Sequence, residues 1–186
     1  VAEEVPGGFA SMYKVLTGFE DGGRCRRGKF VDTLGGAQFS TPDVVDRLRT
    51  HSDSIEGRHT TAPAVTLAAS DPANPYGAAL PWPQSMAGDD APKHRPGRKA
   101  GGLVSLVDGE LVLFVERGGR TVLTFTDDIG VLRTAAESLA ATVKRGGIDK
   151  VVVEKVDGAT IHGNDFAPLL TEVGFSATPR GFRLRA

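Results

Sequence analysis

The first forty residues carry an apolar pattern that predicts a helix followed by a basic β-hairpin. Apolar side chains recur at intervals of three and four positions, the spacing that lines one helical face: Phe9, Met12, Tyr13, Leu16 and Phe19. The glycines of Asp21-Gly22-Gly23 should end this helix, because glycine interrupts helical backbone. Residues 24–30 and 31–39 then predict two short strands, with further glycines at turn or bulge positions.

A second helix should begin at Thr41-Pro42-Asp43. Threonine caps a helix, proline loses no hydrogen bond at the first position, and the helix dipole favours an acid there. The apolar residues of this helix run out by about His51. A helix, a basic hairpin and a helix are what remains of a winged helix whose N-terminal helices lie upstream. We therefore interpret residues 1–52 as the C-terminal part of a winged-helix module, residues 53–62 as a linker, and the chain as a piece of a longer protein.

The following segment combines one predicted strand with loops. Pro63 to Ser70 predicts a short strand, and the prolines and small polar residues of 71–77 indicate a turn-rich loop. Prolines and glycines are then frequent as far as Gly102, which predicts a long mobile loop at about 83–100.

Residues 103–186 predict an α+β arrangement. Asp-Gly and Gly-Gly pairs separate β-rich runs at 103–107, 111–116 and 121–126, which indicates a three-stranded meander. The elements expected after it are a helix capped by Asp127 or Asp128, a strand at 150–156, a helix capped by Asn164 or Asp165, and a closing edge strand in which Phe182 and Leu184 alternate with arginines. Strands grouped together and then interleaved with two helices indicate the α+β class.

Composition narrows the functional classes. The hydrophobic fraction of 40% and charged fraction of 24% are ordinary for a globular protein. The chain has neither a long apolar run nor a signal-like start, so we expect a soluble, cytoplasmic protein without membrane contact. Cys25 has no partner for an internal disulfide, and the dispersed histidines predict no metal site. A net charge of −1 restricts nucleic-acid binding to local basic patches.

Six short phrases carry a family resemblance: Gly28-Lys29-Phe30-Val31 leading to Ala37-Gln38-Phe39, then Ala69 to Pro75, Leu106 to Leu111, Glu116 to Arg120, Glu154 to Gly158 and Thr178 to Arg185. In this order they cover most of residues 7–50, 63–82 and 101–185. Together they resemble the C-terminal region of the long-form bacterial large helicase-related (Lhr) proteins.

The resemblance implies a DNA-repair context. Long Lhr proteins carry an N-terminal motor that uses ATP and Mg to move 3′ to 5′ on single-stranded DNA, followed by winged helices and a terminal β-barrel-like module. This chain would hold the end of the last winged helix and that terminal module, which would contain two helices. It would bind no cofactor of its own. Its partners would be single-stranded or 3′-tailed DNA and the rest of the helicase polypeptide. Family members are also associated with uracil removal and with tetramers, which implies a homo-oligomer. The sequence holds no Gly-x-x-x-x-Gly-Lys-[Ser/Thr] motif, so we expect no ATPase activity from this chain alone.

Basic residues form three clusters that are candidates for nucleic-acid contact. On the hairpin, alternate strand residues share a face and offer cations to a phosphate backbone. The clusters are Arg24, Arg26, Arg27 and Lys29 on the hairpin, Lys93, His94, Arg95, Arg98 and Lys99 on the long loop, and Arg180, Arg183 and Arg185 at the C-terminus. Each cluster also has a simpler interpretation. The hairpin cations would protect an edge strand, the loop cations would keep the loop soluble, and the C-terminal cations would pair with nearby acids.

Two alternative functions stay open beside that of a DNA-engaging accessory region. A DNA glycosylase would need a carboxylate or polar group beside a base pocket, commonly with an aromatic ring. The candidates are Asp71, Asn74 and Tyr76 beside Trp82, and Asp165 on the last helix. Turn formation explains Asp71 and helix capping explains Asp165, so no catalytic residue is assigned. The second alternative is a purely structural oligomerisation module.

Overall fold

The computed structural model describes residues 8–31, 34–56, 64–87 and 94–186. The chain divides into two compact units between Thr61 and Ala62. Most of the predicted linker and residues 88–93 of the predicted mobile loop lie outside the described residues. Within the described ranges, no helix combines the length and the apolar character that crossing a membrane requires.

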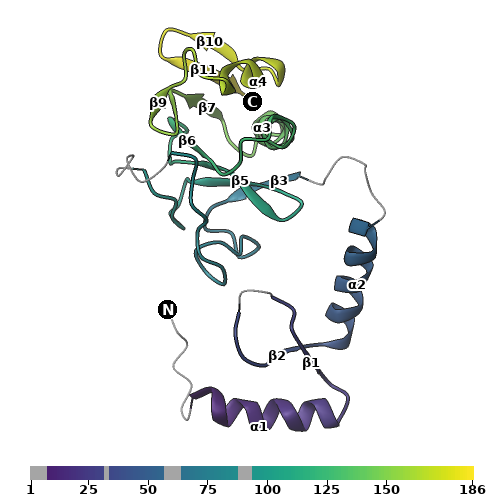
Figure 1. The fold of residues 1–186 in the computed structure, drawn as a ribbon. Coiled ribbons are helices and arrows are strands. Elements are labelled where there is room, and N and C mark those ends of the chain that lie inside the picture. Colours follow the sequence, from purple (N-terminus) through teal and green to yellow (C-terminus); the bar gives the residue numbers. More distant parts are fainter. Residues whose placement is uncertain (1–7, 32–33, 57–63, 88–93) are drawn as a thin grey trace. The chain divides into compact units, whose positions relative to one another are not determined.

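The N-terminal unit contains a helix, a β-hairpin and a second helix, as the sequence pattern predicted (Figure 1). Its elements are α1 (Gly8–Asp21), β1 (Arg26–Gly28), β2 (Gln38–Ser40) and α2 (Pro42–Glu56). The two strands are antiparallel, with Arg27 opposite Phe39. Helix α2 continues beyond its expected end near His51, because its polar last turns contain neither glycine nor proline.

The strands of this hairpin are shorter than predicted because Gln38 occupies backbone groups between them. Its Oε1 accepts hydrogen bonds from the amides of Phe30 and Val31, each at 2.8 Å. Its Nε2 donates to the carbonyls of Val31 and Leu34 at 2.9 and 2.8 Å. Backbone groups bound to this side chain are not available for a longer ladder, so the hairpin opens into a broad wing.

Helix α1 has the predicted amphipathic pattern, but the described residues cover its apolar face only in part: Tyr13 packs against the ring of Phe39, and Tyr13 and Leu16 are half-buried. No residue of α1 is buried, and Phe9 and Val15 are 58% and 48% exposed. Periodicity identified the helix correctly and could not show what covers it.

The terminal unit is a mixture of helices and strands, which confirms the α+β class. Its elements are β3 (Ala64–Ala68), β4 (Leu103–Val107), β5 (Glu110–Val115), β6 (Thr121–Thr124), α3 (Ile129–Lys144), β7 (Lys150–Val153), β8 (Lys155–Val156), β9 (Ala159–Thr160), α4 (Phe166–Glu172), β10 (Ser176–Thr178) and β11 (Gly181–Arg185). Among its described residues, one sheet has the order β3-β4-β5-β6-β8-β9 and another the order β10-β11-β7. The predicted meander is confirmed, because β4, β5 and β6 are antiparallel neighbours.

The larger sheet is covered on both faces. Helix α3 packs against β3, β4 and β5, and its Leu139 is fully buried with Leu113 in one apolar cluster (Figure 1). The segment 69–87 contributes Tyr76 to a second cluster, which contains Phe114. Coverage of both faces explains why β5 reads as an uninterrupted apolar run and not as an alternation.

The β-barrel-like closure implied by the resemblance is wrong for the described residues, in which no sheet closes on itself. Strands β3 and β9 stand at opposite ends of the larger sheet and do not pair with each other. The unit buries its apolar surface under α3, α4 and the segment 69–87, so closure of the sheet is not needed to form a core.

Two further strand predictions need correction. The single strand expected at 150–156 divides into β7 and β8, which belong to different sheets. The chain changes sheets because the amides of Glu154 and Lys155 both donate to the carbonyl of Arg120, at 2.8 and 2.9 Å. The C-terminal strand, expected at an edge, is β11 at the centre of its sheet. Its second neighbour, β10, is short and has no apolar alternation that would have predicted it.

Two predicted Asp-Gly turns and the predicted cap of α3 are confirmed. Asp108-Gly109 and Asp157-Gly158 have positive φ at both residues, 51° and 83° in the first pair and 50° and 84° in the second. Such pairs form the tight turns whose twist suits a hairpin. Asp128 caps α3 by accepting hydrogen bonds from the amides of Gly130 and Val131 at 2.8 and 3.1 Å.

Candidate nucleic-acid interface

A hollow of about 500 Å³ lies between the hairpin and α2, and its rim is basic. It is lined by Arg26, Arg27, Gly28, Lys29, Phe30, Val45, Leu48 and Arg49. None of these residues is acidic. Three predicted cations thus meet at one surface, and α2 adds Arg49, which the sequence reasoning missed. Its position four residues after Val45 was the available signal, because that spacing places both on one side of a helix.

Two acids, exposed Asp46 and half-buried Glu20, balance part of this charge. A guanidinium nitrogen of Arg26 lies 3.7 Å from Asp46 Oδ1, and one of Arg49 lies 3.4 Å from the same oxygen. Arg27 lies 3.4 Å from Glu20 Oε2 and donates to the hydroxyl of Tyr13 at 2.7 Å. The arginines are about half exposed, 47% for Arg26 and 47% for Arg27, so these pairs are weak in water.

Arg24 stands apart from the rest of the hairpin cluster. Arg24 precedes β1, so the predicted shared strand face of Arg24 and Arg26 does not form. Its guanidinium carbon lies 5.5 Å from the centre of the Phe19 ring, a cation–π arrangement at the end of α1.

The C-terminal cations lie on one face of the β10-β11-β7 sheet. In the register of β11 with β7, Arg183 is opposite Val152 and Arg185 is opposite Lys150. Side chains directly opposite each other point to the same face, so strand pairing brings Lys150 to Arg183 and Arg185. The sequence reasoning missed Lys150, although its alternation with buried Val151 was a signal for an outward-facing residue.

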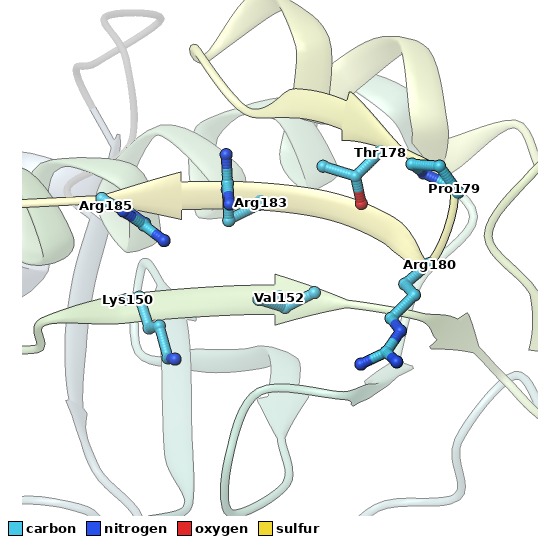
Figure 2. A pocket seen from close by; sticks show the side chains of 7 residues that line it. All are labelled: Lys150, Val152, Thr178, Pro179, Arg180, Arg183 and Arg185. Carbon is cyan, nitrogen blue, oxygen red and sulfur yellow. The ribbon is translucent and has the colours of Figure 1, made fainter.

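These cations surround a hollow of about 390 Å³ (Figure 2). It is lined by Lys150, Val152, Thr178, Pro179, Arg180, Arg183 and Arg185. Among the described residues, no carboxylate is within ion-pair distance of any of these four cations. Pairing with nearby acids therefore does not explain the cluster.

The loop cluster is used differently. Arg98 donates from one nitrogen to the carbonyls of Asn74 and Tyr76 at 2.6 and 3.3 Å. Its other terminal nitrogen donates to the carbonyls of Ser70 and Asp71 at 3.2 and 3.0 Å. In the same segment, His94 Nδ1 lies 2.9 Å from Glu116 Oε1. Lys93 lies outside the described residues. Arg98 is therefore a structural clamp and not a cation available for phosphate.

The glycosylase candidates near Trp82 have structural roles. Asn74 is 1% exposed, and its side chain bonds to the carbonyl of Ala69 at 2.9 Å and to the amide of Tyr76 at 3.1 Å. Asp71 accepts from the amide of Ala73 at 2.8 Å, which confirms its turn role. Tyr76 stacks on Trp82 with ring centres 6.4 Å apart, and burial raises the pKa of its hydroxyl.

Asp165 differs from these candidates. Asn164, not Asp165, caps α4, because Asn164 Oδ1 accepts from the amide of Phe166 at 2.9 Å. Asp165 makes no capping hydrogen bond with its side chain, although it occupies the cap position. It lines a hollow of about 230 Å³ together with Asp127 and Asp157. Across the described part of the chain, no group of three or more His, Cys, Asp or Glu side chains is arranged to hold a metal ion.

Comparison with known proteins agrees with the winged-helix arrangement. Residues 1–60 match the winged-helix domain of the Large helicase-related protein. The chain is 51% identical over 191 residues to a Mycolicibacterium smegmatis protein named Lhr helicase/probable uracil glycosylase, and 36% identical over 183 residues to the Lhr helicase/uracil glycosylase of Escherichia coli. The alignments cover 99% and 97% of this chain but only 12% and 11% of those relatives. The predicted resemblance to Lhr proteins is therefore confirmed, and its winged-helix part lies in the N-terminal unit, where residues 1–60 match the Lhr winged-helix domain.

Proposed function

We propose that this chain is the C-terminal accessory region of an Lhr-type ATP-dependent 3′–5′ DNA helicase in DNA repair, and that its winged-helix unit engages DNA. Similarity to Lhr helicases over 99% of the chain supports this context. The motor, with its ATP and Mg, belongs to another part of the parent polypeptide. Single-stranded or 3′-tailed DNA and that parent polypeptide are the proposed partners, and the cytoplasm is the proposed location.

The basic hollow between the hairpin and α2 carries the proposal for DNA. Its arginines are about half exposed or more, and ion pairs at that exposure contribute about 0.2–1 kcal/mol. A phosphate group can therefore replace Asp46 as the partner of Arg26 and Arg49 at little cost. Release of counterions from the DNA would drive the exchange.

The test compares two double variants by fluorescence anisotropy with 3′-tailed DNA over a range of salt concentrations. Arg26→Gln with Arg49→Gln should weaken binding and reduce the salt slope by about 1.4, since each lost contact contributes about 0.7 on single strands. Lys14→Gln with Arg47→Gln removes the same charge from exposed positions of the same unit and should leave the slope unchanged. Equal binding by the two variants would exclude the hollow as the DNA contact.

Base excision is a second candidate function, because the names of both relatives include uracil glycosylase. Asp165 is the better candidate for the catalytic carboxylate. It is exposed, makes no capping hydrogen bond and lines a hollow, whereas the candidates near Trp82 have structural roles. Excision of uracil from a single-stranded oligonucleotide, lost in Asp165→Asn and kept in Asp149→Asn, would support this activity. Unchanged excision by Asp165→Asn would exclude Asp165.

Self-association is a separate proposal, supported by the exposed apolar residues Phe9 and Val15 of α1. Light scattering on the chain and on Phe9→Glu with Val15→Glu tests it. If the unmodified chain is a multimer and this variant dissociates, the result supports assembly through α1. If the unmodified chain is a monomer, the result contradicts it.

A further inference from the structure

Like charges face each other on the outer side of β7 and β11. Lys150 is directly opposite Arg185 in the antiparallel register. Like charges in such a pair repel and destabilise the sheet. No carboxylate of the described residues lies within ion-pair distance of either cation. An anion bound between them would remove this repulsion, so the arrangement favours a negatively charged ligand.

The backbone positions of the cations are spread along the sheet, although their side chains line one hollow. Arg183 and Arg185 are two strand residues apart, a step of about 6.7 Å, and neighbouring strands lie about 4.8 Å apart. Arg180 extends the row into the turn before β11 (Figure 2). A single phosphate would not reach all of these positions. A chain of phosphates separated by similar steps, as in one strand of nucleic acid, fits the row.

The same surface offers no aromatic ring on which a base could stack. Between the cations, the hollow is lined by Val152, Thr178 and Pro179, and no lining residue is aromatic. Thr178 already donates its hydroxyl hydrogen to the carbonyl of Gly181 at 2.7 Å. Sequence-independent binding of single strands commonly combines a cationic groove with aromatic rings on which bases stack. This face has the cations and no aromatic ring in its lining, so the phosphates are the groups that it is suited to bind.

We infer that the outer face of β7 and β11 is a backbone-binding site that holds one nucleic-acid strand by its phosphates, through Lys150, Arg180, Arg183 and Arg185, without stacking its bases. The inference shares only its ligand class with the proposed function. It rests on other residues in the other unit, so either one stands or fails without the other.

The experiment uses the full chain with Arg26→Gln and Arg49→Gln as background, so that the wing contributes less. Anisotropy is measured with oligo-dT and with an abasic oligomer of equal length. Replacing Lys150, Arg183 and Arg185 by Gln should lower affinity about tenfold at low salt and reduce the salt slope by about 2. Both oligomers should bind equally within about twofold, because their backbones are alike. Replacing Arg117, Arg133 and Arg145 by Gln is the charge-matched control in the same unit and should change neither quantity.

A further variant separates binding from folding. Lys150→Glu places opposite charges across the strand pair, so it should keep or raise the thermal midpoint while it weakens DNA binding. Three results would overturn the inference: binding by the face variant that equals the control, abasic oligomer bound more than about tenfold more weakly than oligo-dT, or charge-matched polyphosphate bound as tightly as DNA. If DNA contact by the hairpin and α2 is wrong, the background variant with Arg26→Gln and Arg49→Gln binds DNA as tightly as the unmodified chain. That result is independent of the β7–β11 face.

Discussion

Lys150 and Arg185 stand directly opposite each other on antiparallel strands, although both are cations. A protein selected only for stability would place an acid at one of these positions. The pair is therefore a local cost of the fold, and it coincides with the one predicted cluster whose cations have no acid partner among the described residues.

Lys150→Glu should raise the free energy of unfolding by about 0.2–1 kcal/mol, the range measured for cross-strand pairs. Urea denaturation at low and high salt checks this, and the gain should shrink at high salt because the interaction is exposed and screened. Lys155→Glu is the control, since its strand partner Thr160 is uncharged. A loss of stability in Lys150→Glu that the control lacks would contradict the repulsion between Lys150 and Arg185.

Gly181→Ala should destabilise the terminal unit by about 2 kcal/mol or more, because the glycine combines positive φ with close packing. Its φ is 146°, and a Cβ added there would collide with the carbonyl oxygen of Val153 on β7. Denaturation followed by circular dichroism measures the loss. Gly97→Ala is the matched control, since the nearest atom to its added Cβ is 3.8 Å away. Similar stability of the two variants would show that β11 does not approach β7 so closely.

Arg98→Ala should cost about 2 kcal/mol, because it leaves carbonyls of the segment 70–76 without their charged donor. Arg98→Lys should recover little, since a lysine lacks the planar fork that reaches several acceptors at once. Arg95→Ala, at an exposed position of the same segment, should change stability by less than about 0.5 kcal/mol. Calorimetric unfolding of the three variants distinguishes a clamp from a solubilising charge, which would make Arg95 and Arg98 equivalent.

The stability of the chain should fall above about pH 10, in part through Tyr76. Burial raises the pKa of its hydroxyl, so the neutral form is favoured in the folded state. This contribution is complete below the ordinary tyrosine pKa and is lost as the pH rises through the folded-state value. Tyr76→Phe cannot ionise and should lose less stability between pH 9 and about 11. Identical alkaline profiles for both proteins, from urea unfolding, would rule out Tyr76 as a contributor.

Several elements could be predicted because their signals lie within a few residues of each other. The Asp108-Gly109 turn, the Asp128 cap and the apolar period of α1 were all predicted, because turns, caps and helical faces depend on near neighbours. The order and spacing of short phrases likewise carried the Lhr resemblance, which the comparisons confirm.

The grouping of the cations and the division of the strands between sheets could not be predicted, because both depend on the folded arrangement. Lys150 joins Arg183 and Arg185 through the pairing of β7 with β11, and Arg98 leaves its cluster to bind the carbonyls of a distant loop. The division of residues 150–156 between two sheets follows from hydrogen bonds to Arg120. Each of these outcomes depends on contacts between residues far apart in the chain. Local periodicity holds no record of such contacts, because it reports which side of an element is apolar and not what that side meets.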